Sequence, residues 1–204
     1  MKFNIKLQNL KELQAAYAQF INAAQAGTGK QLQNAVRTAV NEKSRYVADR
    51  LIRTEMSRAW ADGFWVQVLN DPDVVVVKYK LSSRHPVFDI CDMYARADMF
   101  NLGAGIYPKD KVPAVPVHPH CLCRYAEVID GEVNLKKRRD KTQQAGDKWL
   151  RSLPRLQQKQ VLGVEGVKEW QANGNWQDHL RGWNGLESPD SSLVAQQAKP
   201  LKIS

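Results

Sequence analysis

The residues best suited to chemistry in this chain gather within one six-residue stretch. It holds two of the three cysteines, Cys121 and Cys123, and two of the four histidines, His118 and His120. The third cysteine, Cys91, lies thirty residues before Cys121. Thiolates and imidazoles this close together serve as metal ligands, form disulfides or act in nucleophilic catalysis.

A structural zinc site is the first of these possibilities, because zinc takes four tetrahedral nitrogen and sulfur ligands. Cys121 and Cys123 supply two ligands from one turn, and His118 supplies a third. Cys91 brings the fourth ligand from a distant segment, so that the ion joins two parts of the chain. We therefore predict one zinc ion held by Cys91, His118, Cys121 and Cys123, with His120 as the alternate to His118.

Two structural alternatives stay open for the thiols, namely a disulfide between Cys91 and a later cysteine, or three thiols packed in a small core. The common two-residue spacing between paired cysteines is missing, because Tyr94 stands at that interval from Cys91. Catalysis is a weaker explanation of the cluster. The chain lacks the paired motifs of zinc deaminases and the His-Glu-x-x-His motif of metalloproteases.

Composition indicates a globular protein that is made and kept in a reducing cytosol. Hydrophobic residues make up 43% of the 204 residues and charged residues 25%. The N-terminus lacks the apolar core of a signal peptide, and no apolar run is long enough to cross a bilayer. A reducing cytosol disfavours the disulfide. The formal net charge of +9 favours a polyanionic partner, most commonly a nucleic acid.

Hydrophobic periodicity predicts mainly helices in the first third of the chain. Apolar residues at helical spacing predict helices over residues 7–26 and 30–65. The second would reach roughly 50 Å, which suggests an extended arm that is bent or divided. The valine-rich segment 74–81 predicts a buried strand. Residues 85–117, rich in Pro and Gly, predict a long loop with a short helix over 92–100, pinned by the cysteines at its ends.

The segment after the cysteines predicts a β-hairpin followed by helix. An Asp-Gly pair at 130–131 separates two β-like runs, residues 123–129 and 132–135. Residues 147–162 predict a helix with Gly163 as its C-cap. Three tryptophans are expected to cover the core of the small domain, with docking on a partner as the alternative: Trp170, Trp176 and Trp183.

Together these elements predict an α+β fold with a long N-terminal helical arm, a small antiparallel sheet with a Cys/His-pinned loop, and C-terminal helices. The expected division assigns residues 1–70 to the arm and 71–135 to the small β domain. Residues 136–185 form a basic segment with the C-terminal helices. Residues 186–204, rich in Ser, Gln, Pro and Lys, are expected to form a flexible tail.

A run of four cations provides the strongest local site for phosphate contacts. No helix-turn-helix or finger spacing accompanies it, so we expect non-specific binding to double-stranded DNA. The nucleic-acid-binding residues predicted on this basis are Lys136, Lys137, Arg138 and Arg139.

Three segments of the chain, in this order, resemble the Mu F-like minor head proteins of tailed phages, also called phage head morphogenesis proteins. They are Arg-Thr-Glu-Met-Ser-Arg-Ala at residues 53–59, Asp-Ile-Cys-Asp at 89–92 and His-Pro-His-Cys-Leu-Cys-Arg at 118–124. Residues 150–163 resemble the stretch that often follows in that family. The resemblance covers about residues 45–165 of the chain.

The resemblance implies a minor virion component of a tailed phage or prophage. Such proteins are present in few copies, associate with the phage portal protein at the portal vertex inside the head, and support head morphogenesis and the fate of packaged DNA. Before assembly they reside in the host cytoplasm. Many relatives carry a second cysteine where this chain has Tyr94. If those relatives hold a metal with four sulfurs, either His118, His120 or His85 replaces one sulfur here, or the site is empty.

Two other functions compete with this one, a small metal-dependent nuclease and a free-standing DNA-binding protein. A hydrolytic metal site needs an open coordination position beside a general base, and Asp89 and Asp92 show no paired carboxylate pattern. We therefore expect a non-enzymatic protein that contacts DNA and no membrane.

The helical Arg-Thr-Glu segment contributes two charges that are expected to be architectural. Arg53 and Glu55 stand two residues apart, so they point to different helix faces and do not pair with each other. Each is expected to reach a separate partner and to tie the long helix to the sheet or the loop. The alternative is that both are solvated charges with little effect on stability.

Overall fold

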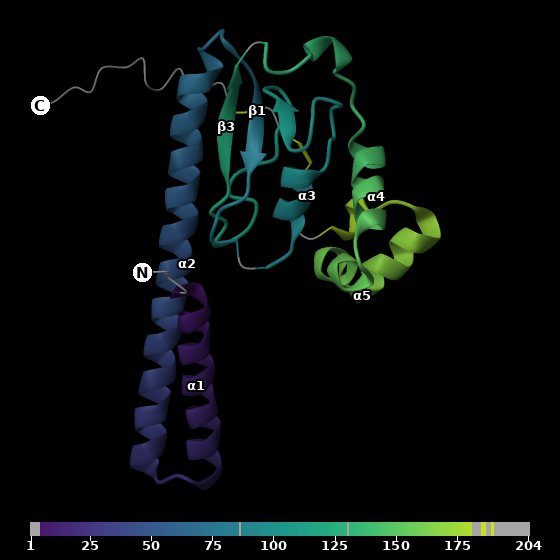
Figure 1. The fold of residues 1–204 in the computed structure, drawn as a ribbon. Coiled ribbons are helices and arrows are strands. Elements are labelled where there is room, and N and C mark those ends of the chain that lie inside the picture. Colours follow the sequence, from purple (N-terminus) through teal and green to yellow (C-terminus); the bar gives the residue numbers. More distant parts are fainter. Residues whose placement is uncertain (1–4, 86, 130, 181–184, 187–188, 190–204) are drawn as a thin grey trace, which may run out of the picture. The chain divides into compact units, whose positions relative to one another are not determined.

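The computed structural model describes residues 5–85, 87–129, 131–180, 185–186 and 189, and it has the predicted α+β fold (Figure 1). The chain divides into two compact units, Met1–Arg53 and Thr54–Ser204. In chain order the elements are α1 (Ile5–Ala26), α2 (Gly29–Leu69), β1 (Val74–Lys80), α3 (Ile90–Arg96), β2 (Ile106–Pro108), β3 (Arg124–Ile129), η1 (Leu135–Lys137), α4 (Thr142–Ser152), α5 (Arg155–Asn173) and η2 (Gln177–His179).

The first unit is a pair of helices, α1 and the first part of α2, which lie side by side (Figure 1). A capping box starts α2: the Gln31 N–H donates to Thr28 Oγ1, and the Thr28 N–H donates to Gln31 Oε1. The two helices bury small and aliphatic side chains between them. These buried residues are Leu13, Ala16, Ala35 and Ala39.

The second unit is built on a three-stranded antiparallel sheet in the order β2-β1-β3. Tyr79 of β1 lies opposite Tyr125 of β3, and both rings are buried. The last part of α2 packs on this sheet through Trp65, whose ring centroid lies 5.0 Å from that of Tyr125. Helix α3 lies between the sheet and α4 (Figure 1).

The C-terminal helices pack through two buried tryptophans. Trp170 and Trp176 are both buried, as expected, and the Trp176 indole N–H donates to the Gln143 carbonyl of α4. Gly146 makes this packing possible, because a Cβ at that position would overlap the Trp176 ring. Helix α5 is kinked at Gly163, whose φ of 81° interrupts the helical backbone there.

The two N-terminal helices and the valine-rich strand are confirmed, and the short helix lies at Ile90–Arg96. The single helix predicted over 147–162 is wrong, because the helix breaks at Leu153 and Pro154 into α4 and α5, and α5 continues past Gly163 to Asn173.

The predicted hairpin is also wrong. Residues 132–135 form no strand, and Leu135 instead begins a 3₁₀ turn. The third strand is β2, which lies within the Pro- and Gly-rich segment and pairs Tyr107 with Val77. Asp130 of the expected turn lies outside the described residues.

The compact units divide at Thr54, inside the region expected to form the helical arm. The reason is packing, because Ala61, Trp65 and Val68 of α2 belong to the core of the sheet. Trp183 and nearly all of the expected tail, residues 186–204, lie outside the described residues. Within the part of the chain that the structure describes, no helix carries an apolar stretch that would span a bilayer.

Candidate metal centre

Cys91 is placed by the first turn of α3. Asp89 is the N-cap of this helix, and its Oδ1 accepts from the Cys91 N–H at 2.8 Å. Asp92 completes a capping box, since its Oδ2 accepts from the Asp89 N–H at 3.1 Å. This arrangement fixes the backbone on both sides of the cysteine, which is fully buried.

Cys121 and Cys123 are placed by a tight turn that leads into β3. The Cys121 N–H donates to the His118 carbonyl at 3.0 Å. His120 sits in the left-handed backbone region, with φ of 65°, where histidine is one of the more tolerated residues. Its N–H donates to Thr54 Oγ1 at 3.3 Å, which ties the turn to α2.

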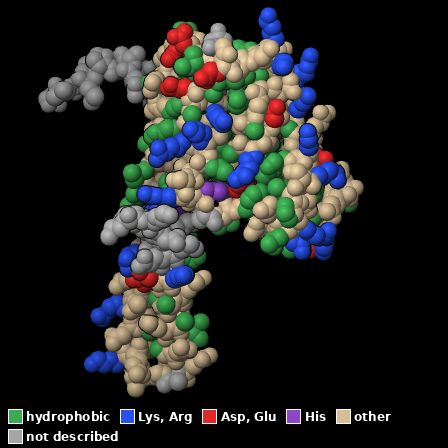
Figure 2. Space-filling model, viewed as in Figure 1, with side chains coloured by type: hydrophobic (Ala, Val, Ile, Leu, Met, Phe, Trp, Pro, Cys, Tyr) green, Lys and Arg blue, Asp and Glu red, His purple; other side chains and the backbone are tan. Residues whose placement is uncertain are grey.

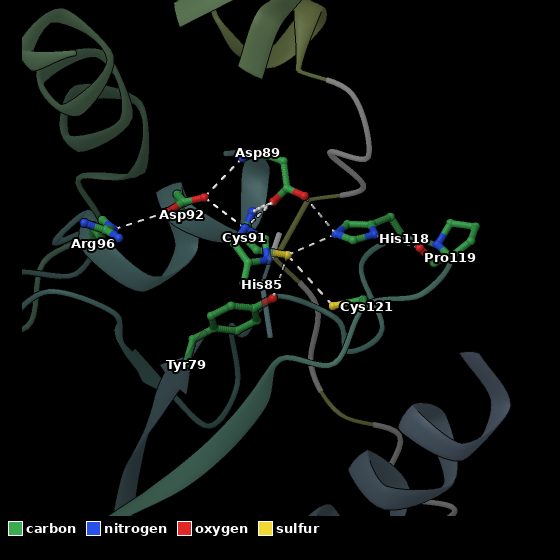
Figure 3. A network of polar contacts seen from close by, with 9 residues as sticks. All are labelled: Tyr79, His85, Asp89, Cys91, Asp92, Arg96, His118, Pro119 and Cys121. Carbon is green, nitrogen blue, oxygen red and sulfur yellow. Dashed lines mark hydrogen bonds and ion pairs between the residues drawn. The ribbon is translucent and has the colours of Figure 1, made fainter. Parts of the chain in front are cut away.

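The sulfur and nitrogen atoms that the two segments contribute meet around Cys91 (Figure 3). Cys91 Sγ lies 3.8 Å from Cys121 Sγ and 3.4 Å from His118 Nε2. Two sulfur ligands of a tetrahedral zinc ion, each about 2.3 Å from the metal, lie about 3.8 Å apart, and a sulfur and a nitrogen ligand about 3.6 Å apart. The two separations from Cys91 therefore match edges of a zinc tetrahedron.

Cys123 joins the same cluster through a second group of ligand atoms. It lies with Cys91 and His85 in a set whose ligand atoms are all within 4.8 Å of one another, as are those of Cys91, His118 and Cys121. All three thiols are buried and free, so the structure contains no disulfide between them. The Cys/His groups are thus close enough to bind a metal ion.

The two histidines of the cluster are oriented by partners outside it. His118 Nδ1 lies 3.0 Å from the Pro119 carbonyl, which leaves Nε2 facing the cysteine (Figure 3). His85 Nε2 lies 3.0 Å from Asp92 Oδ2. A carbonyl or carboxylate on one ring nitrogen is the arrangement that usually orients a metal-binding histidine through the other nitrogen.

Hydrogen bonds set the charge state of His85 and of the nearby Asp89. The bond to Asp92, and then one to Cys123, raise the pKa of His85 to about 10. Burial alone would raise the pKa of Asp89, but hydrogen bonds from His118 and from the Cys91 N–H lower it. In the absence of metal, His85 is therefore a cation held against carboxylates.

The three thiols shift one another's pKa in opposite directions. Hydrogen bonds to Cys121 and Cys123, together with burial, raise the pKa of Cys91. Hydrogen bonds from Cys121 and Cys91 lower the pKa of Cys123. Proximity thus permits one thiolate and opposes the others, whereas a divalent cation would favour all three thiolates together.

The four predicted ligands thus fall into two potential ligand groups that share Cys91, and the predicted alternate ligand lies outside both. The His120 ring belongs to none of the potential ligand groups among the described residues. His85 takes the place beside the thiols that the sequence assigned to His120.

The carboxylates around the cluster are already engaged in structural contacts. Asp92 is buried and contacts His85, the Asp89 N–H and, at 3.3 Å, the Arg96 guanidinium. Asp89 caps α3 and lies 3.2 Å from His118 Nε2. Neither is placed as a free general base, and three thiolates with one imidazole would complete a four-coordinate shell. The arrangement suits a structural ion.

The prediction that Arg53 and Glu55 tie α2 to the sheet or loop is wrong. Arg53 Nε contacts Asp49 on the same helix at 2.7 Å. Glu55 lies 3.8 Å from Arg58, also on α2, and both side chains are mostly exposed. Thr54, which lies between them, makes the connection to the cysteine turn instead. Its short side chain gave no signal in the sequence.

The predicted phosphate-binding run lies apart from the cluster, on and after η1. All four side chains are exposed. Arg138 is paired with both oxygens of Asp110, at 2.7 and 2.8 Å, and the Arg139 N–H donates to the Phe100 carbonyl. Among the described residues, no carboxylate pairs with Lys136, Lys137 or Arg139.

Comparisons with protein-family models, with curated proteins and with solved structures each return no match for this chain. The resemblance to Mu F-like minor head proteins therefore rests on the motif residues alone.

We expect Thr54→Val to lower the free energy of unfolding by about 1 kcal/mol, the contribution of a typical hydrogen bond. The cause is loss of the acceptor for the His120 N–H. Glu55→Ala, on the same helix, should change it by less than about 0.5 kcal/mol, because exposed ion pairs contribute little. Urea denaturation of both variants measures the difference, and equal effects would contradict a specific role for Thr54.

Proposed function

We propose that this chain is a zinc-stapled structural protein of a tailed-phage or prophage head, a minor head protein without enzymatic activity. The observation that carries the proposal is the convergence of the separate motif segments. Thr54 of the first segment accepts a hydrogen bond from the His120 N–H of the third segment. Cys91 of the second segment contacts Cys121 of the third. The three motifs thus belong to one structural unit.

Zinc is the proposed ion, with Cys91, Cys121, Cys123 and His118 as ligands. The observed separations of 3.8 and 3.4 Å support a tetrahedral site, and soft thiolates favour zinc over magnesium or calcium. His118 is preferred to His85 because its Nε2 already lies 3.4 Å from Cys91 Sγ. His85 is then an outer partner that donates a hydrogen bond to the Cys123 thiolate.

The ion would act as a staple for the long segment between Cys91 and Cys121. This segment contains β2 and much irregular backbone, whose ordering costs conformational entropy. A bound metal ion opposes that cost, since binding free energy at such a site is largely folding free energy. The proposed role is therefore architectural.

The role in the phage head draws on the family resemblance, with support from charge. The net charge of +9 and the unpaired cations of the 136–139 run fit a protein that contacts packaged double-stranded DNA without sequence preference. The proposed protein partner is the phage portal protein, and the proposed location is the portal vertex in the head interior.

Protein purified without chelator or a His tag should contain one zinc ion per chain by elemental analysis. Cys121→Ala should abolish binding, and His118→Ala should weaken it by at least about 10- to 100-fold, more than His85→Ala. His120→Asn is the matched control, because asparagine tolerates the left-handed backbone and the ring is not a ligand. A metal-free, fully folded protein with three free thiols would overturn the site.

The DNA contact should depend on three cations of the run and not on Arg138, which Asp110 neutralises. Replacing Lys136, Lys137 and Arg139 together with Ala should weaken duplex binding equally for unrelated sequences. It should also reduce the slope of log affinity against log salt by up to about 3, nearly one for each lost phosphate contact. Arg138→Ala alone should have little effect. Anisotropy titrations at several salt concentrations measure both effects. Separately, cleavage of the duplex by the zinc-loaded protein would favour the nuclease alternative.

The virion assignment predicts that the protein is packaged in few copies. Quantitative mass spectrometry of purified phage particles from the source strain should find it at a small fraction of the major capsid protein. It should also co-purify with the portal protein from disrupted heads. Its presence only in the soluble fraction of the lysate would contradict the assignment, whatever the outcome for zinc.

A further inference from the structure

A pocket of about 410 Å³ lies between α2, the loop after β1 and the end of the cysteine turn. Its wall from α2 carries Met56 and Trp60, which are 68% and 38% exposed. Its opposite wall carries Leu122 and Arg124, on either side of the buried Cys123. Exposed Trp and Met side chains around one hollow are unusual on a surface that contacts only water.

Trp60 is held rigidly although it is exposed. Its ring stacks on Phe64 with centroids 5.6 Å apart, and Phe64 in turn contacts the buried rings of Trp65 and Tyr125. The exposed indole is therefore the outer end of an aromatic column that begins in the core. Such a side chain loses little conformational freedom when it binds a ligand.

Two cations, Arg84 and Arg124, line the pocket, and further cations lie near Arg124 in the sheet. Lys80 of β1 lies directly opposite Arg124 of β3, and Lys78 is exposed two residues before Lys80. Like charges in a cross-strand pair are destabilising. Arg84 lines the pocket from the loop after β1. Among the described residues, no carboxylate forms an ion pair with any of these four cations. On the face of the molecule that Figure 2 presents, Lys and Arg side chains are in general interspersed with exposed apolar ones.

Arg124 lies over the Trp60 ring in a cation–π contact, which a planar ring could enter only by displacing the guanidinium. The guanidinium carbon lies 5.8 Å from the centroid of the indole. A nucleobase stacked between them needs about 7 Å, twice a van der Waals contact of about 3.5 Å, so Arg124 would shift by only about 1 Å. Both groups stack on bases of any sequence, because every base has a π-face.

We infer that this pocket binds single-stranded nucleic acid, with a base stacked on Trp60 beside Arg124 and the backbone phosphates on Lys78, Lys80 and Arg84. The combination of a basic surface and a rigid aromatic ring is the one that sequence-independent single-strand binders use. An acidic peptide would neutralise the cations and leave the indole face without a matching group. The inference goes beyond the proposed function. The duplex contact is proposed for residues 136–139, whereas this pocket is a different surface and its ligand is single-stranded.

The test is fluorescence anisotropy of a labelled oligothymidylate of about 20 nucleotides with the full, zinc-loaded chain. Trp60→Ala should weaken binding by about 5- to 150-fold, the range that loss of one base–aromatic stack gives, whereas Trp60→Phe should retain most of the affinity. Binding to a duplex of the same length should be unchanged in both variants.

A charge-matched pair of variants separates the pocket from the general positive charge. Lys80→Gln with Arg124→Gln should weaken single-strand binding more than Arg155→Gln with Lys159→Gln, which removes two exposed cations of α5. Equal losses in the two double variants, or unchanged affinity in Trp60→Ala, would overturn the inference. So would stronger binding of labelled polyglutamate than of the oligonucleotide, since the pocket would then be a site for acidic peptides.

Discussion

The second unit depends on how three thiols are accommodated in one buried place. Cys91, Cys121 and Cys123 are nearly inaccessible to water, and two of their sulfur atoms are 3.8 Å apart without a bond. Packed as neutral thiols they would be small apolar side chains with weak polar contacts, whereas as thiolates they would repel one another. Either way, the start of α3 and the start of β3 are held at one point, and the sheet is assembled around it.

The polar contacts around this point are shared between the helix and the ligands. Asp89 caps α3 through the Cys91 N–H and also faces His118. The Tyr79 hydroxyl, near the end of β1, donates to Cys91 Sγ at 3.2 Å. Helix capping, strand placement and ligand orientation are therefore not independent, and a change at one of these groups alters the others. Such a shared network is more consistent with a structural centre than with one that must exchange ligands.

Local patterns in the sequence were sufficient for the elements with regular periodicity. The spacing of apolar residues identified α1, α2 and the strand at Val74–Lys80, since a buried face imposes its own period. The cysteines and His118 could be identified because few other roles fit soft ligands at that spacing. The C-terminal tryptophans were expected in the core, and Trp170 and Trp176 are buried there.

Features that depend on distant contacts could not be predicted in the same way. Strand β2 is three residues long and ends in a proline, so its existence depends on pairing with β1. The Asp-Gly pair after β3 carried a strong local hairpin signal, but Leu135 enters a 3₁₀ turn instead. His85 and Thr54 reach the cluster through tertiary contacts with Asp92 and with His120, which nothing in their neighbouring residues indicates.

The contact between Gly146 and Trp176 has a consequence for how related sequences can vary. Any side chain at position 146 would occupy the space of the indole ring, and any smaller residue at position 176 would leave a cavity beside α4. A substitution at position 146 or 176 is therefore tolerated only when the other of these two positions changes as well. The two positions should covary across an alignment as a long-range pair, which would identify relatives of this domain even where the cysteines have been lost.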